Sequence, residues 1–173
     1  MTPTTGTEPA PTAQPDGVPL LLAALAGQYD RWRWSPGLSP DVVGEALGVA
    51  LTPGPARLMG RDLLGAVTSI PTQPYPVRWH WQLDGRLELV QLSQPPAVPS
   101  WPEVIDKLGD PTVVHPHGSG VFPGSEQRCY LSRGLTVFDG AGLGYQAVWL
   151  YPPTTQEAYA ERTGAFTTPT RSR

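Results

Sequence analysis

The sequence predicts an α+β protein built from two α-β-β-β repeats, which form one antiparallel sheet with short helices on one face and one further helix before the first repeat. Three observations indicate this class. Two short segments carry matching helix start and stop signals, alternating strand patterns follow each of them, and each half contains an Asp-Gly turn between two strands. The two halves span about 39–96 and 100–153.

The length and the charge of the chain limit its domain organisation and its partners. With 173 residues and a formal net charge of −3, the chain suits one globular domain, over 18–164. We expect 1–17, rich in Thr and Pro, to be a disordered tail and 165–173 to be a flexible tail. An acidic chain lacks the basic surface that sequence-independent nucleic-acid binding needs, so no nucleic-acid partner is predicted.

The cysteine content and the apolar run near the N-terminus bear on the compartment. Cys129 is the only cysteine in the sequence, so an internal disulfide is impossible and a reducing compartment is favoured. The apolar run over 18–26 is too short to span a bilayer, and no Lys or Arg precedes it as in a secretory signal. We therefore expect a cytoplasmic protein without a membrane partner.

The segment before the repeats is predicted to hold one helix and a strand end. Asp16 can cap a helix over about 19–30, because a short polar side chain accepts hydrogen bonds from the first helical amides. The residues 31–34 then alternate between Arg and Trp. This period of two predicts a short strand with Trp32 and Trp34 on one face, in the core.

Each repeat begins with a short helix that has recognisable ends. Ser39 is a predicted N-cap, and Gly48 ends that helix. In the second repeat Ser100 and Glu103 form a capping box, and Gly109 is the terminator.

A hairpin follows in each repeat. Asp84-Gly85 and Asp139-Gly140 are predicted turns, because Asp-Gly is a strong short-range hairpin signal. A pair of prolines closes each return strand. The strands are expected at 78–83 and 87–92 in the first repeat and at 133–138 and 145–150 in the second.

The alternation in the first hairpin separates a core side from a solvent side. Val77, Trp79, Trp81 and Leu83 form the predicted core stripe. His80 lies between the two indoles and points, with Arg78 and Gln82, to the solvent side, so it is expected to be an exposed histidine without a special role.

Each half has room for one or two further strands between helix and hairpin, with candidates at 56–59 and at 127–131, one of which per half completes the α-β-β-β unit. The remaining connections, 52–76 and 110–126, are unusually long for a compact domain. Such loops are either recognition loops or simply mobile, and both readings stay open for these two.

The order of the elements resembles a known fold. A helix followed by Leu108-Gly109-Asp110-Pro111, an irregular stretch and a meander, in tandem, is similar to the beta-lactamase-inhibitor-protein-like fold. It also resembles the single-repeat relatives of that fold among bacterial outer-membrane assembly lipoproteins. The resemblance covers about 39–153 and implies a binding or inhibitory module. It transfers no functional residue, since this chain has neither a disulfide pair nor a lipid-bearing cysteine.

No catalytic constellation and no cofactor site is predicted. His115 and His117 could put two imidazoles on one side of an extended segment, with Cys129, Asp139 or His80 as a third zinc ligand. The paired spacing of structural zinc sites is absent, so a solvated loop is the preferred interpretation and no metal is assigned. Cys129 is expected to be buried and inert.

The strand before the last proline pair provides the predicted partner-binding residues. Tyr145, Ala147, Trp149 and Tyr151 are expected on one of its faces, and Val148 and Leu150 on the other. Either the C-terminal helix, predicted over about 155–163 from a capping box, covers the face of Val148 and Leu150, or an aromatic patch is exposed. Tyr and Trp are the residue types that anchor protein partners. The predicted partner-binding residues are Trp149, Tyr151, Tyr145 and Tyr130.

These observations predict a non-enzymatic protein-binding module, of the immunity or inhibitor type, whose partner is another protein. One alternative is a small-molecule-binding protein or small enzyme with a pocket on the concave face of the sheet. A second alternative is a subunit of a larger assembly.

Overall fold

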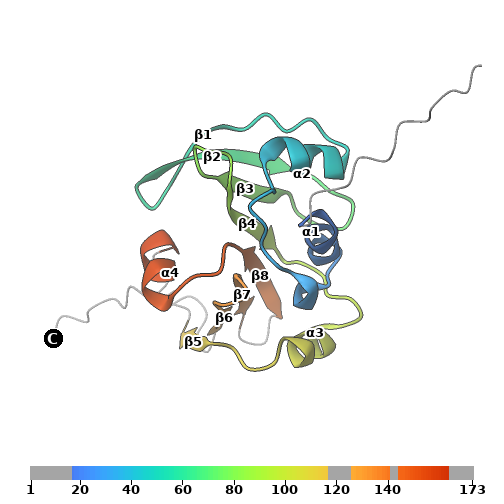
Figure 1. Ribbon diagram of the computed structural model, residues 1–173. Coiled ribbons are helices and arrows are strands. Elements are labelled where there is room, and N and C mark those ends of the chain that lie inside the picture. The colour runs from blue at the N-terminus through green and yellow to red at the C-terminus, as the bar shows by residue number, and fades with distance from the viewer. Residues whose placement is uncertain (1–16, 117–125, 141–143, 164–173) are drawn as a thin grey trace, which may run out of the picture.

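A computed structural model describes residues 17–116, 126–140 and 144–163. Within these residues, eight strands form one fully antiparallel sheet in the order β1-β2-β3-β4-β8-β7-β6-β5, flanked by four α-helices (Figure 1). The predicted α+β class and the antiparallel sheet are confirmed. No helix of the described part is long and apolar enough to cross a membrane. Residues 1–16 of the predicted N-terminal tail, with the proposed cap Asp16, and the predicted C-terminal tail lie outside the described residues. Gly17, the last residue of the predicted N-terminal tail, is buried and precedes α1.

The helices are short, and two of them have the predicted caps. Ser39 Oγ accepts a hydrogen bond from Val42 N at 3.4 Å, and Ser100 Oγ accepts one from Glu103 N at 3.4 Å. Gly48 ends the first of these helices with a φ of +67°, which a residue without a Cβ adopts without strain. The helices are α1 (Val18–Leu25), the 3-10 helix η1 (Tyr29–Arg31), α2 (Pro40–Leu47), α3 (Trp101–Leu108) and α4 (Gln156–Thr163).

The first half contains one strand more than predicted, because the expected connection over 52–76 is largely a hairpin. A glycine in the middle of its second strand weakens the strand pattern, yet it is needed there: a Cβ on Gly65 would lie 2.7 Å from the Cβ of Ala56 on the neighbouring strand. The second half gains a short strand inside the connection over 110–126. The strands are β1 (Gly54–Leu58), β2 (Arg61–Thr68), β3 (Val77–Trp81), β4 (Leu87–Ser93), β5 (Val113–Pro116), β6 (Glu126–Tyr130), β7 (Leu135–Asp139) and β8 (Tyr145–Leu150).

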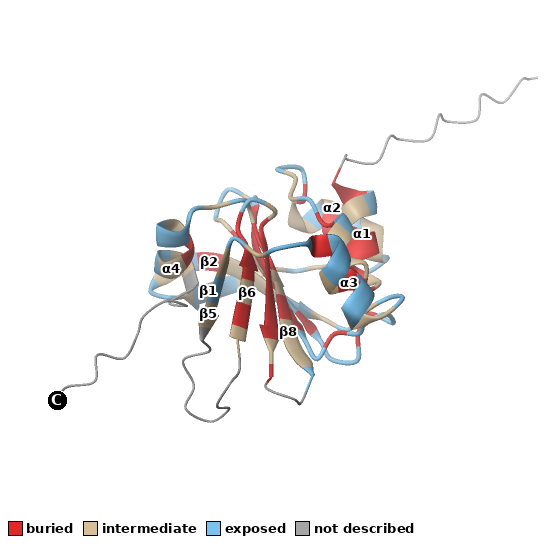
Figure 2. Ribbon diagram, turned by 90° about the horizontal axis from the view of Figure 1, so that it is seen from below, coloured by how far each residue is buried: buried red, intermediate tan, exposed pale blue. Residues whose placement is uncertain are grey.

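The sequence predicts all helices on one face of the sheet, but the structure has helices on both faces. Figures 1 and 2 both show α1, α2 and α3 on one side and α4 on the other. The side of α1 to α3, which we call the helix face, carries the main core around Trp79, Val90 and Val148. The opposite side, the α4 face, carries a smaller cluster in which Tyr159 of α4 packs with Tyr151. The short link 151–155 connects β8 to α4 on this second face.

The Arg-Trp alternation at 31–34 does not form a strand; η1 is followed by extended chain beneath the sheet. Both indoles nevertheless point inward and tie this segment to the sheet. Trp32 Nε1 donates to Gly134 O at 2.9 Å, and Trp34 Nε1 donates to Leu87 O at 3.0 Å. The alternation of Arg and Trp at 31–34 therefore indicates a segment that packs against the sheet, not a strand that is paired within the sheet.

The predicted core stripe of the first hairpin is confirmed for three of its four members. Val77, Trp79 and Trp81 are fully buried, and the two indoles stack with ring centroids 5.9 Å apart. Leu83 is 69% exposed, because β3 has already ended and the residue lies in the turn.

Two register shifts decide which side chains reach the α4 face. In the β3–β4 pair, His80 is opposite Leu89 and Trp81 is opposite Leu87, so Glu88 is an extra residue in the ladder. Its carboxylate consequently reaches the α4 face next to Leu89 instead of continuing the alternation. The second shift, between β7 and β8, places Tyr145 on the helix face.

Candidate functional site

The α4 face of the sheet carries one row of side chains that crosses the central strands. The register places Arg78 of β3 opposite Gln91 of β4, Gln91 opposite Trp149 of β8, and Trp149 opposite Thr136 of β7. Trp149 is half-buried and packs against Phe138 with ring centroids 4.7 Å apart. This row is the structural centre of the candidate site.

Helix α4 covers one part of this face. Tyr159, 1% exposed, packs on Tyr151 with ring centroids 5.1 Å apart. The Tyr151 hydroxyl and Thr136 Oγ1 are 2.8 Å apart and share a hydrogen bond. Burial raises the pKa of Tyr151 and of Tyr159 far above the usual tyrosine range, so both stay neutral. The rest of α4 is largely exposed (Figure 2).

Beside the covered part lies a stretch that remains accessible, which we call the open strip. Val67 is 65% exposed, and both Arg78 and Ser93 are exposed as well. The remaining members are half-buried. The open strip consists of Val67, Arg78, Gln91, Ser93, Ala147 and Trp149.

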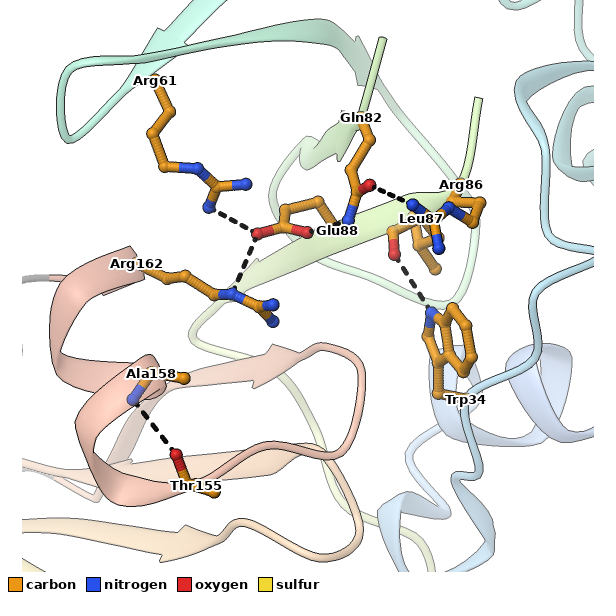
Figure 3. A network of polar contacts seen from close by, with 9 residues as sticks. All are labelled: Trp34, Arg61, Gln82, Arg86, Leu87, Glu88, Thr155, Ala158 and Arg162. Atoms are coloured by element: carbon orange, nitrogen blue, oxygen red, sulfur yellow. Dashed lines mark hydrogen bonds and ion pairs between the residues drawn. The ribbon is translucent and has the colours of Figure 1, made fainter. Parts of the chain in front are cut away.

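A buried carboxylate joins α4 to the sheet at the end of the covered part. Glu88 is only 3% exposed; its Oε1 accepts a hydrogen bond from Arg61 Nη1 at 2.6 Å, and its Oε2 accepts one from Gln82 Nε2 at 2.9 Å. Arg162 of α4 lies 3.6 Å from the same carboxylate (Figure 3). Arg86 extends the network by donating to Gln82 Oε1 at 2.9 Å.

Competing effects set the pKa of Glu88. Burial raises the pKa of this carboxyl, but the hydrogen bonds from Arg61 and Gln82 and the charges of Arg162 and Arg61 outweigh burial, so the pKa lies below its ordinary value. Glu88 is therefore ionised at neutral pH. A carboxylate that is already paired in this way holds α4 in place and is a poor general base.

His80 is not the exposed histidine that the alternation predicted. It is half-buried on the α4 face, and its Nδ1 is buried with no hydrogen-bond partner among the described residues. Burial and the nearby Arg78 charge lower its pKa, against a raising effect of Glu88. The imidazole is consequently neutral at pH 7.

The hollow between α4 and the sheet is too small for a metabolite. Its volume is about 10 Å³, room for one water. It is lined mainly by apolar side chains together with Glu88 and Arg162. A small-molecule site there would require α4 to move.

The structure does not bring the four predicted partner-binding residues onto one surface. Trp149 lies in the open strip, whereas Tyr151 is buried under α4. Tyr145 packs on the helix face, where it stacks on Trp101 of α3 with ring centroids 4.3 Å apart. Tyr130 is buried in the main core. Helix α4 covers the Tyr151 side and not, as predicted, the side of Val148 and Leu150, which pack in the main core. Partner binding by the four predicted residues stays a prediction.

The residues considered for zinc do not form a ligand cluster. His115 lies on β5 opposite Gln127, and His117 falls outside the described residues. Across the described ranges, no group of three or more His, Cys, Asp or Glu side chains could hold a metal ion.

Cys129 is buried as predicted, and its reactivity reports on α4. The thiol has no exposed surface and packs in the cluster with Tyr159. Burial raises its pKa, against the lowering effect of hydrogen bonds with Thr136 and Tyr159.

We expect slow labelling of Cys129 by a disulfide reagent at neutral pH, and at least about tenfold faster labelling in Tyr159→Ala, since opening α4 is a local event. Glu161→Ala, an exposed change on the same helix, should label as slowly as the native chain. A Tyr159→Ala protein that labels no faster would show that α4 does not shield Cys129.

Sequence reasoning missed the charged residues of this face. Glu88 interrupts an otherwise apolar strand, a signal that the sequence did carry. The contacts of Glu88 with Arg61 and Arg162 span long stretches of sequence and follow from the register shift in β4. Arg78 was recognised only as a member of the polar side of β3.

Comparison with protein-family models, with curated protein sequences and with solved structures finds no significant match.

Proposed function

We propose that this chain is a non-enzymatic protein-binding module that docks another protein on the open strip. The half-buried indole of Trp149 supports the proposal, because it combines a fixed apolar surface with an accessible edge in the middle of the sheet. Aromatic side chains held in this way commonly supply much of the binding free energy of a protein interface.

The proposal includes the duplicated architecture that the resemblance to the beta-lactamase-inhibitor-protein-like fold implies. The strand order reads β1 to β4 from one edge and β5 to β8 from the other, with β4 and β8 paired in the centre. A Ser-capped helix with a proline in its first turn stands before each set, as α2 before β1 and α3 before β5. These features support two related halves that together present one broad binding face. The type of protein that we propose is an immunity or inhibitor protein, and its proposed compartment is the cytoplasm.

The experiment is a comparison of co-purified proteins. Tagged native protein, Trp149→Ala and Val114→Ala are isolated from the source organism at moderate salt, and stoichiometric companions are identified by mass spectrometry. We expect one dominant companion with the native chain, its loss with Trp149→Ala, and its retention with Val114→Ala. Val114 is a matched control because it is an exposed apolar residue on edge strand β5, outside the open strip.

The melting temperatures of the three proteins decide whether a loss is specific. Val114→Ala should unfold at the temperature of the native chain, and Trp149→Ala somewhat lower, because its half-buried indole packs on Phe138; both should be folded at the temperature of the isolation. A companion that stays bound to a folded Trp149→Ala protein would place the docking surface elsewhere. A pure native protein without any companion would contradict the proposed function.

A further inference from the structure

We infer that the partner docked on the open strip is an acidic protein segment, recognised jointly by Arg78 and Trp149. This inference rests on the proposed function and adds the chemistry of the partner. The charge of the open strip is opposite in sign to the net charge of the whole chain.

The open strip is locally cationic. Arg78 is the one charged side chain among its six residues, whereas the chain as a whole has a formal net charge of −3. Glu88 is buried and already satisfied by Arg61 and Gln82, so it offers little negative potential to an approaching molecule. A surface of this sign attracts acidic partners and repels basic ones.

Arg78 is the cation of this face that is free to act on a partner. It is exposed, and it makes no ion pair with any residue that the structure describes. Arg61 and Arg162, in contrast, are held by Glu88. An arginine guanidinium binds a carboxylate through two parallel hydrogen bonds, which gives direction as well as charge.

The spacing of Arg78 and Trp149 defines what the partner must present. They lie in one cross-strand row, separated by Gln91 of β4. Strands in a sheet are about 4.8 Å apart, so the two positions are about 10 Å apart, which is about three residues of extended chain. The fitting segment thus carries a carboxylate about three residues from an apolar or aromatic side chain.

The same residue types also occur in single-strand nucleic-acid sites, which stack bases on aromatic rings along a track of cations. Here one unpaired arginine stands beside one indole, in a chain of net negative charge. These observations favour a protein segment, and nucleic-acid binding becomes an outcome of the test.

The test is a selection from a random linear peptide library on the immobilised full chain. Four proteins are used in parallel: native, Arg78→Glu, Trp149→Ala and Arg31→Glu. Arg31 is an exposed arginine of η1, on the opposite side of the sheet, so its variant carries the same charge change away from the open strip. Thermal unfolding confirms that all four are folded.

We expect native and Arg31→Glu proteins to select peptides with Asp or Glu about three residues from an aromatic or aliphatic residue. Those peptides should bind Arg78→Glu at least about tenfold more weakly, the size expected for a lost charge pair. Arg78→Glu should instead select basic peptides.

Three results would overturn the inference, and they separate it from the proposed function. Peptides that depend on Trp149 but show no acidic preference would leave the docking surface standing and remove the acidic partner. No enrichment on native protein above that on Trp149→Ala would remove both. Tighter binding of a fluorescent oligothymidine than of any selected peptide, lost in Arg78→Glu, would assign the strip to nucleic acid.

Discussion

Replacing Trp32 with alanine is expected to lower the free energy of unfolding by about 3–5 kcal/mol, the range for a large aromatic side chain removed from a core. Trp32 is fully buried, and its indole donates to Gly134 O across 102 residues of sequence. The change therefore opens a cavity, removes one of the two hydrogen bonds to Gly134 O, which keeps the bond from Tyr151 N at 2.8 Å, and loosens the N-terminal segment from the second half of the sheet. Urea unfolding followed by tryptophan fluorescence or circular dichroism measures the loss.

Two further variants make this prediction specific. Trp32→Phe keeps most of the apolar volume but loses the N–H donor, so its cost should be smaller, about 1–3 kcal/mol. Leu83→Ala changes an exposed turn residue and should alter stability by less than about 0.5 kcal/mol. A Trp32→Ala protein as stable as Leu83→Ala would contradict the role of this indole as a tie between the segment and the sheet.

Replacing Glu88 with glutamine is expected to remove much of the acid sensitivity of the fold. The folded-state pKa of Glu88 is lowered, so its contribution to stability is fully present above the unfolded-state pKa, about 4.3 for a glutamate, and is lost as the pH falls through the lower folded-state value. Urea unfolding at pH 7 and at several values below pH 5 measures this contribution. The native chain should lose stability over this acid range, and Glu88→Gln should lose less.

At pH 7, Glu88→Gln should destabilise the fold by about 1–3 kcal/mol, because two arginines lose a charged acceptor. Both arginine side chains are more than a third exposed, so water replaces part of the lost interaction and the cost stays below that of breaking a fully buried pair. Glu45→Gln, on the exposed surface of α2, is the matched control and should leave the pH 7 stability unchanged. If Glu88→Gln lost as much stability between pH 7 and the values below pH 5 as the native chain does, other groups would determine the acid sensitivity.

The local signals of the sequence predicted the fold well where short-range chemistry decides the structure. The caps at Ser39 and Ser100, the Asp84-Gly85 turn and the buried stripe from Val77 to Trp81 all follow from interactions within a few residues. Each depends on backbone geometry that a particular side chain either satisfies or forbids.

The errors have a common physical cause, which is tertiary context. Strand β2, the partner of β1 in the first hairpin, was not predicted because Gly65 weakens its strand pattern, although close contact with Ala56 requires a glycine there. The Arg-Trp alternation looked like a strand because Trp32 and Trp34 bury their indoles from an extended segment. Neither fact is visible without the neighbouring strand.

The candidate site was predicted only in part for the same reason. Trp149 was identified from its residue type and strand position, but the shift between β7 and β8 moved Tyr145 to the opposite face. The extra residue in β4 likewise created the Glu88 network, which no period-two pattern could predict. A one-residue change of register reverses the face of each side chain beyond it.

The dissociation constant of the co-purified companion, measured by titration calorimetry for the native chain and for Trp149→Ala, tests the central claim most directly. If Trp149 anchors the partner on the open strip, the Trp149→Ala protein should bind the companion about thirtyfold more weakly or worse, equivalent to about 2 kcal/mol of binding free energy. Val114→Ala, outside the strip, should bind as the native chain does. A folded Trp149→Ala protein that binds the companion with unchanged affinity would contradict the account.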